Sequence, residues 1–257
     1  MRKPLFVGNW KMNLAGPEAT ELTKKLTLAV GEVDDVEVAI APAFTSIRPV
    51  SSIIAASSLG LAAQNLHAED KGAFTGEVSG AMLAELRVKY VIVGHSERRR
   101  AFNETDVMVN LKIEAALRNN IVPIVCLGEK GEDRLARKTL TVVRKQLNAL
   151  LEGIPPEQAA RTVIAYEPVW AIGTGHNATP DQVQEVHKYL RDRLTKRYST
   201  EVADQVRILY GGSVRADNIY DLMMEPDVDG VLVGSSSLDS EQFAAICRYR
   251  QMKKAEA

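Results

Sequence analysis

Cysteine is scarce in this chain, with two residues among 257. Cys126 falls within an apolar run and Cys247 lies near the C-terminus, so neither a disulfide framework nor a cysteine metal site is predicted. The histidines likewise show no H-x-H or i, i+4 pair of the kind that ligates a metal. We therefore expect two reduced thiols and no metal.

An excess of charge of one sign is also missing. The chain has 32 Lys and Arg against 33 Asp and Glu, a formal net charge of -1. Without a basic field, neither nucleic acid nor an anionic membrane surface is expected as a partner, and an anionic ligand must be held locally. No apolar run reaches the roughly 18 residues of a membrane span, and the N-terminal run is too short for a signal peptide. We expect a cytoplasmic protein.

Serine- and glycine-rich linkers and low-complexity tracts are absent as well, so a single domain over residues 1–257 is predicted. What the chain does contain is apolar runs of strand length that alternate with segments of helical periodicity. This alternation predicts a parallel sheet with helical crossovers. The predicted strands are 5–9, 36–41, 59–64, 90–94, 121–128, 162–167, 206–211 and 228–234.

Eight β/α units in about 250 residues are typical of a closed (β/α)8 barrel. An open doubly wound sheet more often carries a G-x-G-x-x-G fingerprint after its first strand, whereas NWKMN stands there in this chain. In a barrel the chemistry collects at the carboxyl ends of the strands, and these ends are unusually polar. The polar or glycine residues there are Asn9, Lys11, Gln64, Asn65, His95, Glu97, Glu167, Gly211, Gly212, Ser213, Gly234 and Ser235.

Glu167 is the most informative of these residues. It ends the apolar run RTVIAY and is followed at once by Pro168, which cannot continue a strand. Taken alone, Glu167 could equally be a strand-end acid turned to solvent. Because so many polar groups converge at the same predicted rim, a catalytic carboxylate is the favoured interpretation.

Three other polar residues have simpler alternatives. Lys11 could be a solvated surface lysine, and Glu97 a first-turn acid that complements a helix dipole and only secondarily a partner of Lys11 or Arg98. His95 opens a predicted helix, where the positive end of the dipole disfavours the charged ring. We therefore expect a neutral His95 that can donate a hydrogen bond.

Glycine recurs in IGTG, YGGS and VGS, near the ends of the last three predicted strands. Backbone N–H groups at such glycines can approach a ligand closely, and together the three loops predict an anion pocket. Each loop alone could be an ordinary tight turn.

Four segments resemble signature sequences of the triosephosphate isomerase family: NWKMN (9–13), GHSERR (94–99), AYEPVWAIGTG (165–175) and YGGSV (210–214). The resemblance extends over essentially the whole chain. It implies a role in glycolysis and gluconeogenesis, the interconversion of dihydroxyacetone phosphate and glyceraldehyde 3-phosphate through an enediol(ate), with triose phosphate as substrate and neither cofactor nor metal.

The resemblance also implies a role for each site residue. Glu167 would be the base, His95 would polarise the carbonyl, and Lys11, helped by Asn9 and positioned by Glu97, would stabilise negative charge. The backbone donors to phosphate would be Gly173, Ser213, Gly234 and Ser235. The lid would consist of Pro168, Val169 and Trp170 as first hinge, Ala171, Ile172, Gly173 and Thr174 as tip, and Gly175, His176 and Asn177 as second hinge.

The loop 65–79 is long, and its tip (Phe74, Thr75, Gly76 and Glu77) is too apolar to remain comfortably in water. The resemblance implies that this loop inserts into a second subunit, with Thr75 beside the other chain's Asn9 and Lys11. We expect a homodimer, and a tetramer remains open.

Three departures from the family pattern qualify these expectations. His176 stands where lysine is usual, segment 128–134 differs and is expected to affect only the rim, and Ser235 and Ser236 replace Gly-Ala beside the phosphate. Two other functions remain open: another phosphate-binding barrel isomerase or an aldolase, and a non-catalytic barrel that binds sugar phosphates. Such a barrel enzyme should need a Schiff-base lysine or a second acid in the barrel, and no predicted strand ends in a lysine that is suitably placed.

Overall fold

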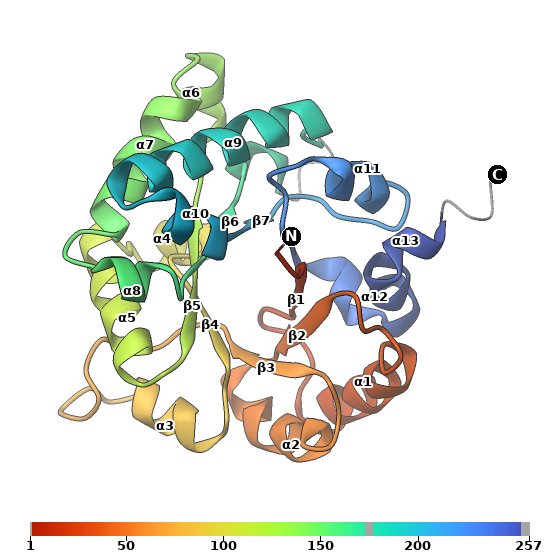
Figure 1. Cartoon of the computed structure of the whole chain (residues 1–257). Coiled ribbons are helices and arrows are strands. Elements are labelled where there is room, and N and C mark those ends of the chain that lie inside the picture. The colour runs from red at the N-terminus through yellow and green to blue at the C-terminus, as the bar shows by residue number, and fades with distance from the viewer. Residues whose placement is uncertain (1, 173–176, 253–257) are drawn as a thin grey trace.

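The computed structural model describes residues 2–172 and 177–252. Its strands are all parallel and pair in chain order, and β8 pairs with β1 to close a barrel that the helices surround (Figure 1). The strands are β1 (Leu5–Asn9), β2 (Glu37–Ala41), β3 (Gly60–Ala63), β4 (Tyr90–Val93), β5 (Val122–Leu127), β6 (Val163–Tyr166), β7 (Arg207–Tyr210) and β8 (Gly230–Val233). The fold is therefore the predicted single-domain (β/α)8 barrel.

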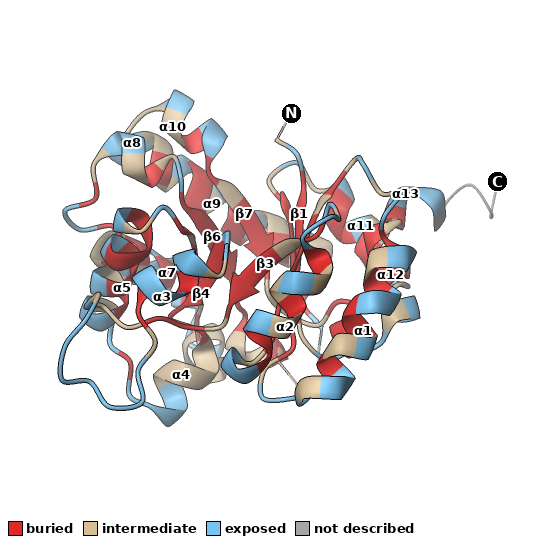
Figure 2. Cartoon of the chain, turned by 90° about the horizontal axis from the view of Figure 1, so that it is seen from below, coloured by how far each residue is buried: buried red, intermediate tan, exposed pale blue. Residues whose placement is uncertain are grey.

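The helices pack their apolar faces on the barrel and leave their polar faces exposed (Figure 2). The longer ones are α1 (Gly16–Ala29), α2 (Phe44–Ile54), α5 (Asp106–Arg118), α7 (Thr139–Leu150), α9 (Pro180–Arg197) and α12 (Ser240–Cys247). The shorter ones are α3 (Gly80–Glu85), α4 (Ser96–Ala101), α6 (Gly131–Leu135), α8 (Pro156–Ala159), α10 (Thr200–Gln205), α11 (Ile219–Met224), α13 (Tyr249–Met252), and the 3-10 turns η1 (Val169–Ala171) and η2 (Ser235–Leu238). Within the described residues, no helix is both long and apolar enough to cross a membrane.

Strand alternation explains which side chains reach the barrel axis. Leu5 and Val7 of β1 belong to a buried cluster inside the barrel, whereas Phe6 belongs to the cluster between strands and helices. Asn9 continues the inward series at the carboxyl end of β1. By the same period of two, Val163 and Ala165 of β6 point inward and Glu167 follows them. The inward-facing set thus changes from apolar to polar where the strands end.

Several strands end earlier than predicted. β6 stops at Tyr166, β7 at Tyr210 and β8 at Val233, so Glu167, Gly211 and Gly234 each lie one residue beyond the ladder. The sequence prediction counted these residues as strand because periodicity continues through them. The hydrogen bonds between strands do not stop abruptly where the strands end, since Glu167 still donates its N–H to Leu127 O at 2.8 Å.

An ion cluster lies at the amino ends of the strands, the opposite end of the barrel from the polar strand ends. Glu37 accepts hydrogen bonds from Tyr90 Oη at 2.6 Å and from Arg207 Nη1 at 2.7 Å, and it also pairs with Lys89. Burial works against ionisation of Glu37, but these three donors outweigh it and lower the pKa of Glu37 to about 2. The cluster joins β2, β4 and β7 through one carboxylate.

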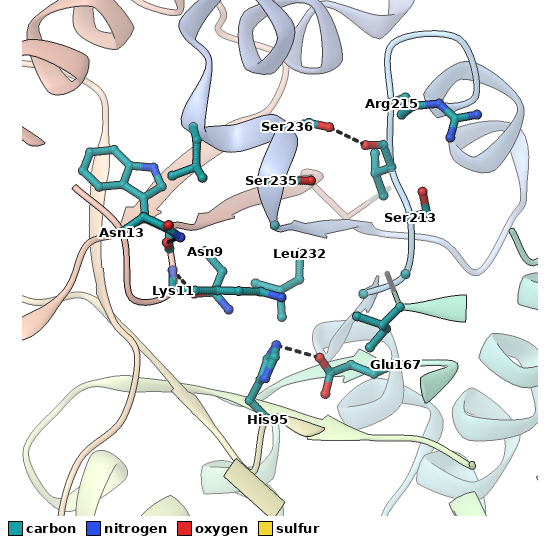
Figure 3. A pocket seen from close by; sticks show the side chains of 17 residues that line it. Asn9, Lys11, Asn13, His95, Glu167, Ser213, Arg215, Leu232, Ser235 and Ser236 are labelled. Atoms are coloured by element: carbon teal, nitrogen blue, oxygen red, sulfur yellow. Dashed lines mark hydrogen bonds and ion pairs between the residues drawn. The ribbon is translucent and has the colours of Figure 1, made fainter. Parts of the chain in front are cut away.

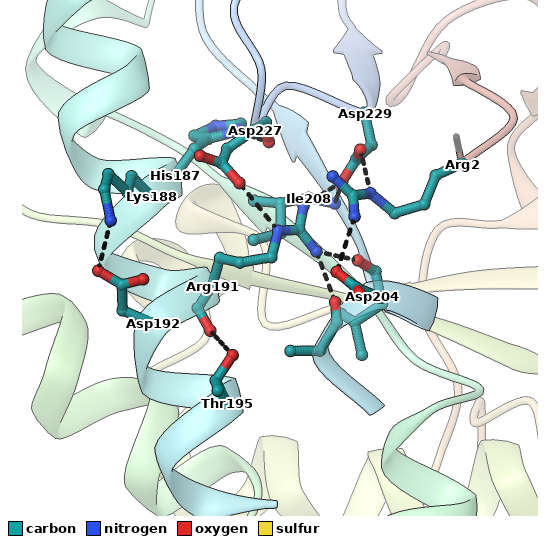
Figure 4. A network of polar contacts seen from close by, with 12 residues as sticks. Arg2, His187, Lys188, Arg191, Asp192, Thr195, Asp204, Ile208, Asp227 and Asp229 are labelled. Carbon is teal, nitrogen blue, oxygen red and sulfur yellow. Dashed lines mark hydrogen bonds and ion pairs between the residues drawn. The ribbon is translucent and has the colours of Figure 1, made fainter. Parts of the chain in front are cut away.

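A buried guanidinium anchors α9 to the strands that follow it (Figure 4). Arg191 donates to Ala203 O at 2.7 Å and to Val206 O at 2.6 Å, and it pairs with Asp227 at 3.0 Å and with Asp229. The buried charge is thereby fully compensated, as a buried guanidinium requires. The network fixes the loops that enter β7 and β8, the two strands that lead to the predicted anion pocket.

Candidate active site

A cavity of about 600 Å³ opens at the carboxyl ends of the strands (Figure 3). It gathers most of the residues that the sequence placed at this rim. The predicted rim and lid residues that line it are Asn9, Lys11, His95, Glu167, Ile172, Gly211, Gly212, Ser213, Gly234 and Ser235. Glu97 lies outside this cavity, in a neighbouring one of about 810 Å³ that also contains Lys11. Gly173 lies outside the described residues.

Glu167 is buried in this cavity, with 2% of its surface exposed, so it is not a strand-end acid turned to solvent. Its Oε2 accepts a hydrogen bond from the backbone N–H of Ser96 at 2.9 Å, and its Oε1 lies 3.0 Å from Nε2 of His95. The segment after β4 therefore contacts the Glu167 carboxylate, at the end of β6, through one hydrogen bond and one close approach of the His95 ring. A carboxylate that faces a cavity of this kind can act as a general base.

Gly211 leaves the space that the Glu167 side chain occupies. A Cβ atom at position 211 would lie 2.9 Å from Cγ of Glu167, closer than such contacts allow. The glycines of YGGS were predicted to bind an anion, and this steric role of Gly211 was not predicted. The sequence position of Gly211 could have indicated this role. Gly211 directly follows β7, just as Glu167 directly follows the adjacent β6, so the two residues lie side by side.

His95 reaches the site because the chain turns sharply at Gly94, whose φ is +70°. Such a left-handed φ suits glycine and ends the alternation of β4 before His95. His95 then caps α4, and its Nδ1 accepts a hydrogen bond from the N–H of Glu97 at 3.2 Å. Because Nδ1 needs its lone pair for this contact, the geometry suits a ring with its proton on Nε2, which faces Glu167.

Two opposing effects act on the protonation of His95. Burial disfavours the charged ring, but the Glu167 carboxylate outweighs burial and raises the pKa of His95 above its ordinary value. The helix dipole expected from the sequence is weak, because α4 has only 6 residues. Burial and the hydrogen bond from the Glu97 N–H favour the neutral ring, whereas the Glu167 carboxylate, which the sequence did not place beside His95, opposes it.

Lys11 is held from two directions. Its Nζ lies 2.7 Å from Oε1 of Glu97, and its backbone N–H donates to Oδ1 of Asn9 at 3.1 Å. Gln64 donates to the Lys11 carbonyl at 2.7 Å, which supports a backbone with φ of 54°. A left-handed lysine costs on the order of 1 kcal/mol, and strain of this kind concentrates at functional sites.

The contact with Lys11 changes the pKa of Glu97. Its partial burial works against ionisation, but the hydrogen bond from Lys11 outweighs it, so the pKa of Glu97 lies below its ordinary value. Asn65, another predicted rim residue, instead accepts a hydrogen bond from the buried Lys112 at 2.8 Å.

The loops after β7 and β8 form the far wall of the cavity (Figure 3). Ser235 opens the 3-10 turn η2 and has a negative φ, so a serine in place of glycine carries no left-handed strain. A Cβ atom at Gly234 would lie 3.5 Å from Cε of Lys11, which places this wall beside the lysine. The arrangement provides backbone N–H groups and the Lys11 ammonium around one space suited to an anion.

The described start of the predicted lid rests on Glu129. Trp170 donates its Nε1–H to Oε1 of Glu129 at 2.8 Å, and Val169 donates its N–H to the Glu129 carbonyl at 3.1 Å. Glu129 is fully buried, and Tyr166 also donates to it, at 3.0 Å. Segment 128–134, which was expected to affect only the rim, thus supplies the hydrogen-bond partner of the lid's tryptophan. The lid residues Gly173, Thr174, Gly175 and His176 lie outside the described residues.

The fold and the cavity together define a class: a (β/α)8 barrel equipped for acid–base chemistry on a small anionic substrate. Known proteins narrow this class. The family model for triosephosphate isomerase matches residues 4–250. The chain belongs to the triosephosphate isomerase family.

Relatives named triosephosphate isomerase match almost the whole chain. The protein from Chloroflexus aurantiacus is 49% identical over 97% of this chain and 100% of its own length. The protein from Endomicrobium trichonymphae is 52% identical over 97% and 99%, and that from Carboxydothermus hydrogenoformans is 50% identical over 96% and 99%.

Proposed function

We propose that this protein interconverts dihydroxyacetone phosphate and D-glyceraldehyde 3-phosphate through an enediol(ate), with the residues of the described cavity as the catalytic groups. The observation that carries the proposal is the meeting of Glu167, His95 and Lys11 in one cavity, each from a different strand end. The reaction moves one proton between adjacent carbons and one between their oxygens. It needs a base, a hydrogen-bond donor and a positive charge, and these three side chains supply them.

The proposed steps begin with Glu167. Its carboxylate removes a proton from the carbon next to the carbonyl, and the electron pair of that C–H bond forms the C–C double bond of the enediol(ate). The Nε2–H of His95 donates to the carbonyl oxygen, which takes up the charge, and the ring then moves a proton between the two oxygens. Glu167 returns its proton to the neighbouring carbon. The sum is an isomerisation with no net loss of atoms or electrons.

The starting arrangement requires one movement. Glu167 is held by Ser96 and lies beside His95 in the structure, so the carboxylate must turn away to reach a substrate carbon. The same turn frees Nε2–H of His95 for the substrate oxygen. It also removes the carboxylate that raises the pKa of His95, which favours the neutral ring during the reaction.

The charge of the substrate would be met by the opposite wall. Lys11, held by Glu97 and assisted by Asn9, lies where it can stabilise charge on the enediolate and the phosphate. Backbone N–H groups around Ser213, Gly234 and Ser235 would hold the phosphate oxygens, together with Gly173 from outside the described residues. Closure of the lid 168–177 would exclude water, which strengthens these interactions and protects the enediolate from losing phosphate.

We further propose that the protein acts as a homodimer in the cytoplasm. The loop tip Phe74 to Glu77 is exposed, and Figure 2 shows this loop extending away from the barrel. The Phe74 side chain is 43% exposed and has the ring of His67 on one side, at 4.1 Å between centroids. Met12, which follows Lys11, is 94% exposed. A second subunit that covers both apolar surfaces would stabilise the site through Lys11.

The rival functions have weaker support. An aldolase would need a Schiff-base lysine in the cavity, and among the described residues the lysine that lines it is Lys11, whose Nζ contacts Glu97. A barrel that only binds sugar phosphates would not require a buried carboxylate beside a histidine that can donate a hydrogen bond as a neutral ring. The cavity contains both.

A deuterium-exchange assay tests the proposal directly. The purified protein is given dihydroxyacetone phosphate in D2O, and NMR follows both the product and the label at its carbons. We expect glyceraldehyde 3-phosphate that carries deuterium from solvent, because the base exchanges its proton before returning it. Conversion without exchange would contradict the enediol route, and no conversion in either direction would overturn the proposed function.

A further inference from the structure

The loops after β7 and β8, which form the far wall of the cavity, are joined by few hydrogen bonds of the sheet. β6 and β7 pair at four register positions, whereas β7 and β8 pair at one, Tyr210 with Val231. Near the amino ends, Asp229 and Ile208 add hydrogen bonds at 2.8 and 2.9 Å. Beyond Tyr210, the spacing between the two loops therefore depends on other contacts.

Each loop is braced within itself. After β7, Asn218 donates to the Ser213 carbonyl at 3.1 Å and accepts from the Arg215 N–H at 2.8 Å. After β8, the Ser237 hydroxyl donates to the Gly234 carbonyl at 2.6 Å. These bonds give each loop a fixed shape, but they do not fix one loop against the other.

The hydroxyl of Ser236 joins the two loops. It donates to the carbonyl oxygen of Val214 at 3.0 Å, as the dashed line in Figure 3 shows. Ser236 is the second residue of η2 and Val214 follows Ser213, so the bond lies next to both groups proposed to bind phosphate. Both partners also line the cavity. An alanine at this position could not make this bond.

We propose that Ser236 is a positioning residue for the phosphate group: its hydroxyl fixes the distance between the β7 and β8 loops, so that their backbone N–H groups converge on one anion. The inference rests on the proposed function for its substrate. It extends that function by naming the side chain that aligns the two loops of the phosphate pocket. A pocket whose loops are already fixed binds phosphate more tightly, because less conformational entropy is lost on binding.

The experiment compares the full-length enzyme with Ser236→Ala and Ser236→Thr. Alanine removes the hydroxyl from a half-buried side chain without adding volume, and threonine keeps it. Ser52→Ala is the matched control, because the Ser52 hydroxyl also donates to a backbone carbonyl, that of Arg48 at 3.2 Å, but on α2 and away from the cavity. For each protein we measure kcat, KM, the inhibition constant of inorganic phosphate and Tm.

For Ser236→Ala we expect KM and the phosphate inhibition constant to rise by about three- to tenfold, the range that loss of one hydrogen bond represents. The value of kcat should change by less than about twofold, since the carboxylate and imidazole are untouched. Ser236→Thr should return both constants to within about twofold of the parent, and Ser52→Ala should leave them unchanged.

Two results would overturn the inference: a phosphate inhibition constant unchanged in Ser236→Ala, or a fall in kcat and kcat/KM by the same factor. A lower Tm with unchanged phosphate affinity would count as the first of these. Calorimetric titration with inorganic phosphate separates this inference from the proposed function. A parent protein that binds phosphate but does not isomerise triose phosphates would refute the function alone, whereas a parent that binds no phosphate would refute the role of Ser236.

Discussion

Oε1 of Glu167 lies 3.0 Å from Nε2 of His95. The other oxygen of Glu167 accepts a hydrogen bond from Ser96, 71 positions earlier in the sequence. The two groups proposed to move protons therefore contact each other before substrate arrives. The Glu167 carboxylate raises the pKa of His95, and each group must be released for the reaction. The first two predictions test this coupling.

Replacement Glu167→Gln should nearly abolish turnover while the fold and the dimer persist. The amide can still accept the hydrogen bond from Ser96, but it cannot take a proton from carbon, and general-base catalysis contributes about 100-fold to 10,000-fold. Steady-state kinetics measures the loss, with circular dichroism and sedimentation as controls for structure. A variant that retains a rate within a few-fold of the parent would show that another group is the base.

The same substitution should lower the pKa of His95. The Glu167 carboxylate raises this pKa in the free enzyme, whereas burial, which disfavours the charged ring, persists in the variant. NMR of labelled imidazole nitrogens measures the pKa and identifies the neutral tautomer, which we expect to carry its proton on Nε2. His187, whose pKa burial lowers to about 4, serves as an internal reference. An unchanged or higher pKa of His95 in the variant would contradict the coupling.

Shortening the loop at Phe74, Thr75 and Gly76 should produce monomers with low activity. The deletion removes the apolar tip proposed to cover the partner's Met12 and to support its Lys11. Sedimentation and kinetics are measured on the same samples. Leu28→Ser is the control, because Leu28 is 84% exposed on α1 and lies outside the proposed interface. A fully active monomer would refute the link between assembly and catalysis.

The substitution Ser235→Gly should change kcat/KM by less than about tenfold, equivalent to 1.4 kcal/mol. Ser235 has a negative φ, so glycine relieves no left-handed strain. The variant loses a hydroxyl that can donate to phosphate, a bond worth about 0.5 to 1.5 kcal/mol. Inhibition constants for a phosphorylated transition-state analogue provide the measurement. A hundredfold tighter constant in the glycine form would mean that serine damages the pocket.

Glu37→Gln should make the stability of the fold less sensitive to acid. The pKa of Glu37 is about 2 in the folded protein against 4.5 ordinarily, so its contribution is full above about pH 5 and is lost as the pH falls toward 2. Between about pH 7 and pH 3 the parent should lose on the order of 2 kcal/mol more free energy of unfolding than the variant. Urea unfolding at one fixed protein concentration measures this difference. Equal losses would show that Glu37 titrates normally.

Patterns along the chain are sufficient to predict the barrel and the rim that carries the site. Apolar runs and amphipathic segments alternate eight times, and parallel strands place all their carboxyl ends at one side. Period-two alternation along β1 and β6 also specifies that Asn9 and Glu167 follow inward-facing residues. These properties are local, or follow from connectivity, and therefore can be read along the chain.

The contacts among the rim residues could not be predicted from the chain and follow from the folded barrel. Lys11 contacts Glu97 across 86 positions of sequence, and Trp170 contacts Glu129 across 41. The steric role of Gly211 depends on where a neighbouring strand ends, and the Ser236 bond depends on the spacing of two loops. Periodicity specifies which face a residue takes but not which distant residue it meets there, because that is fixed by barrel closure and by the packing of side chains from different strands.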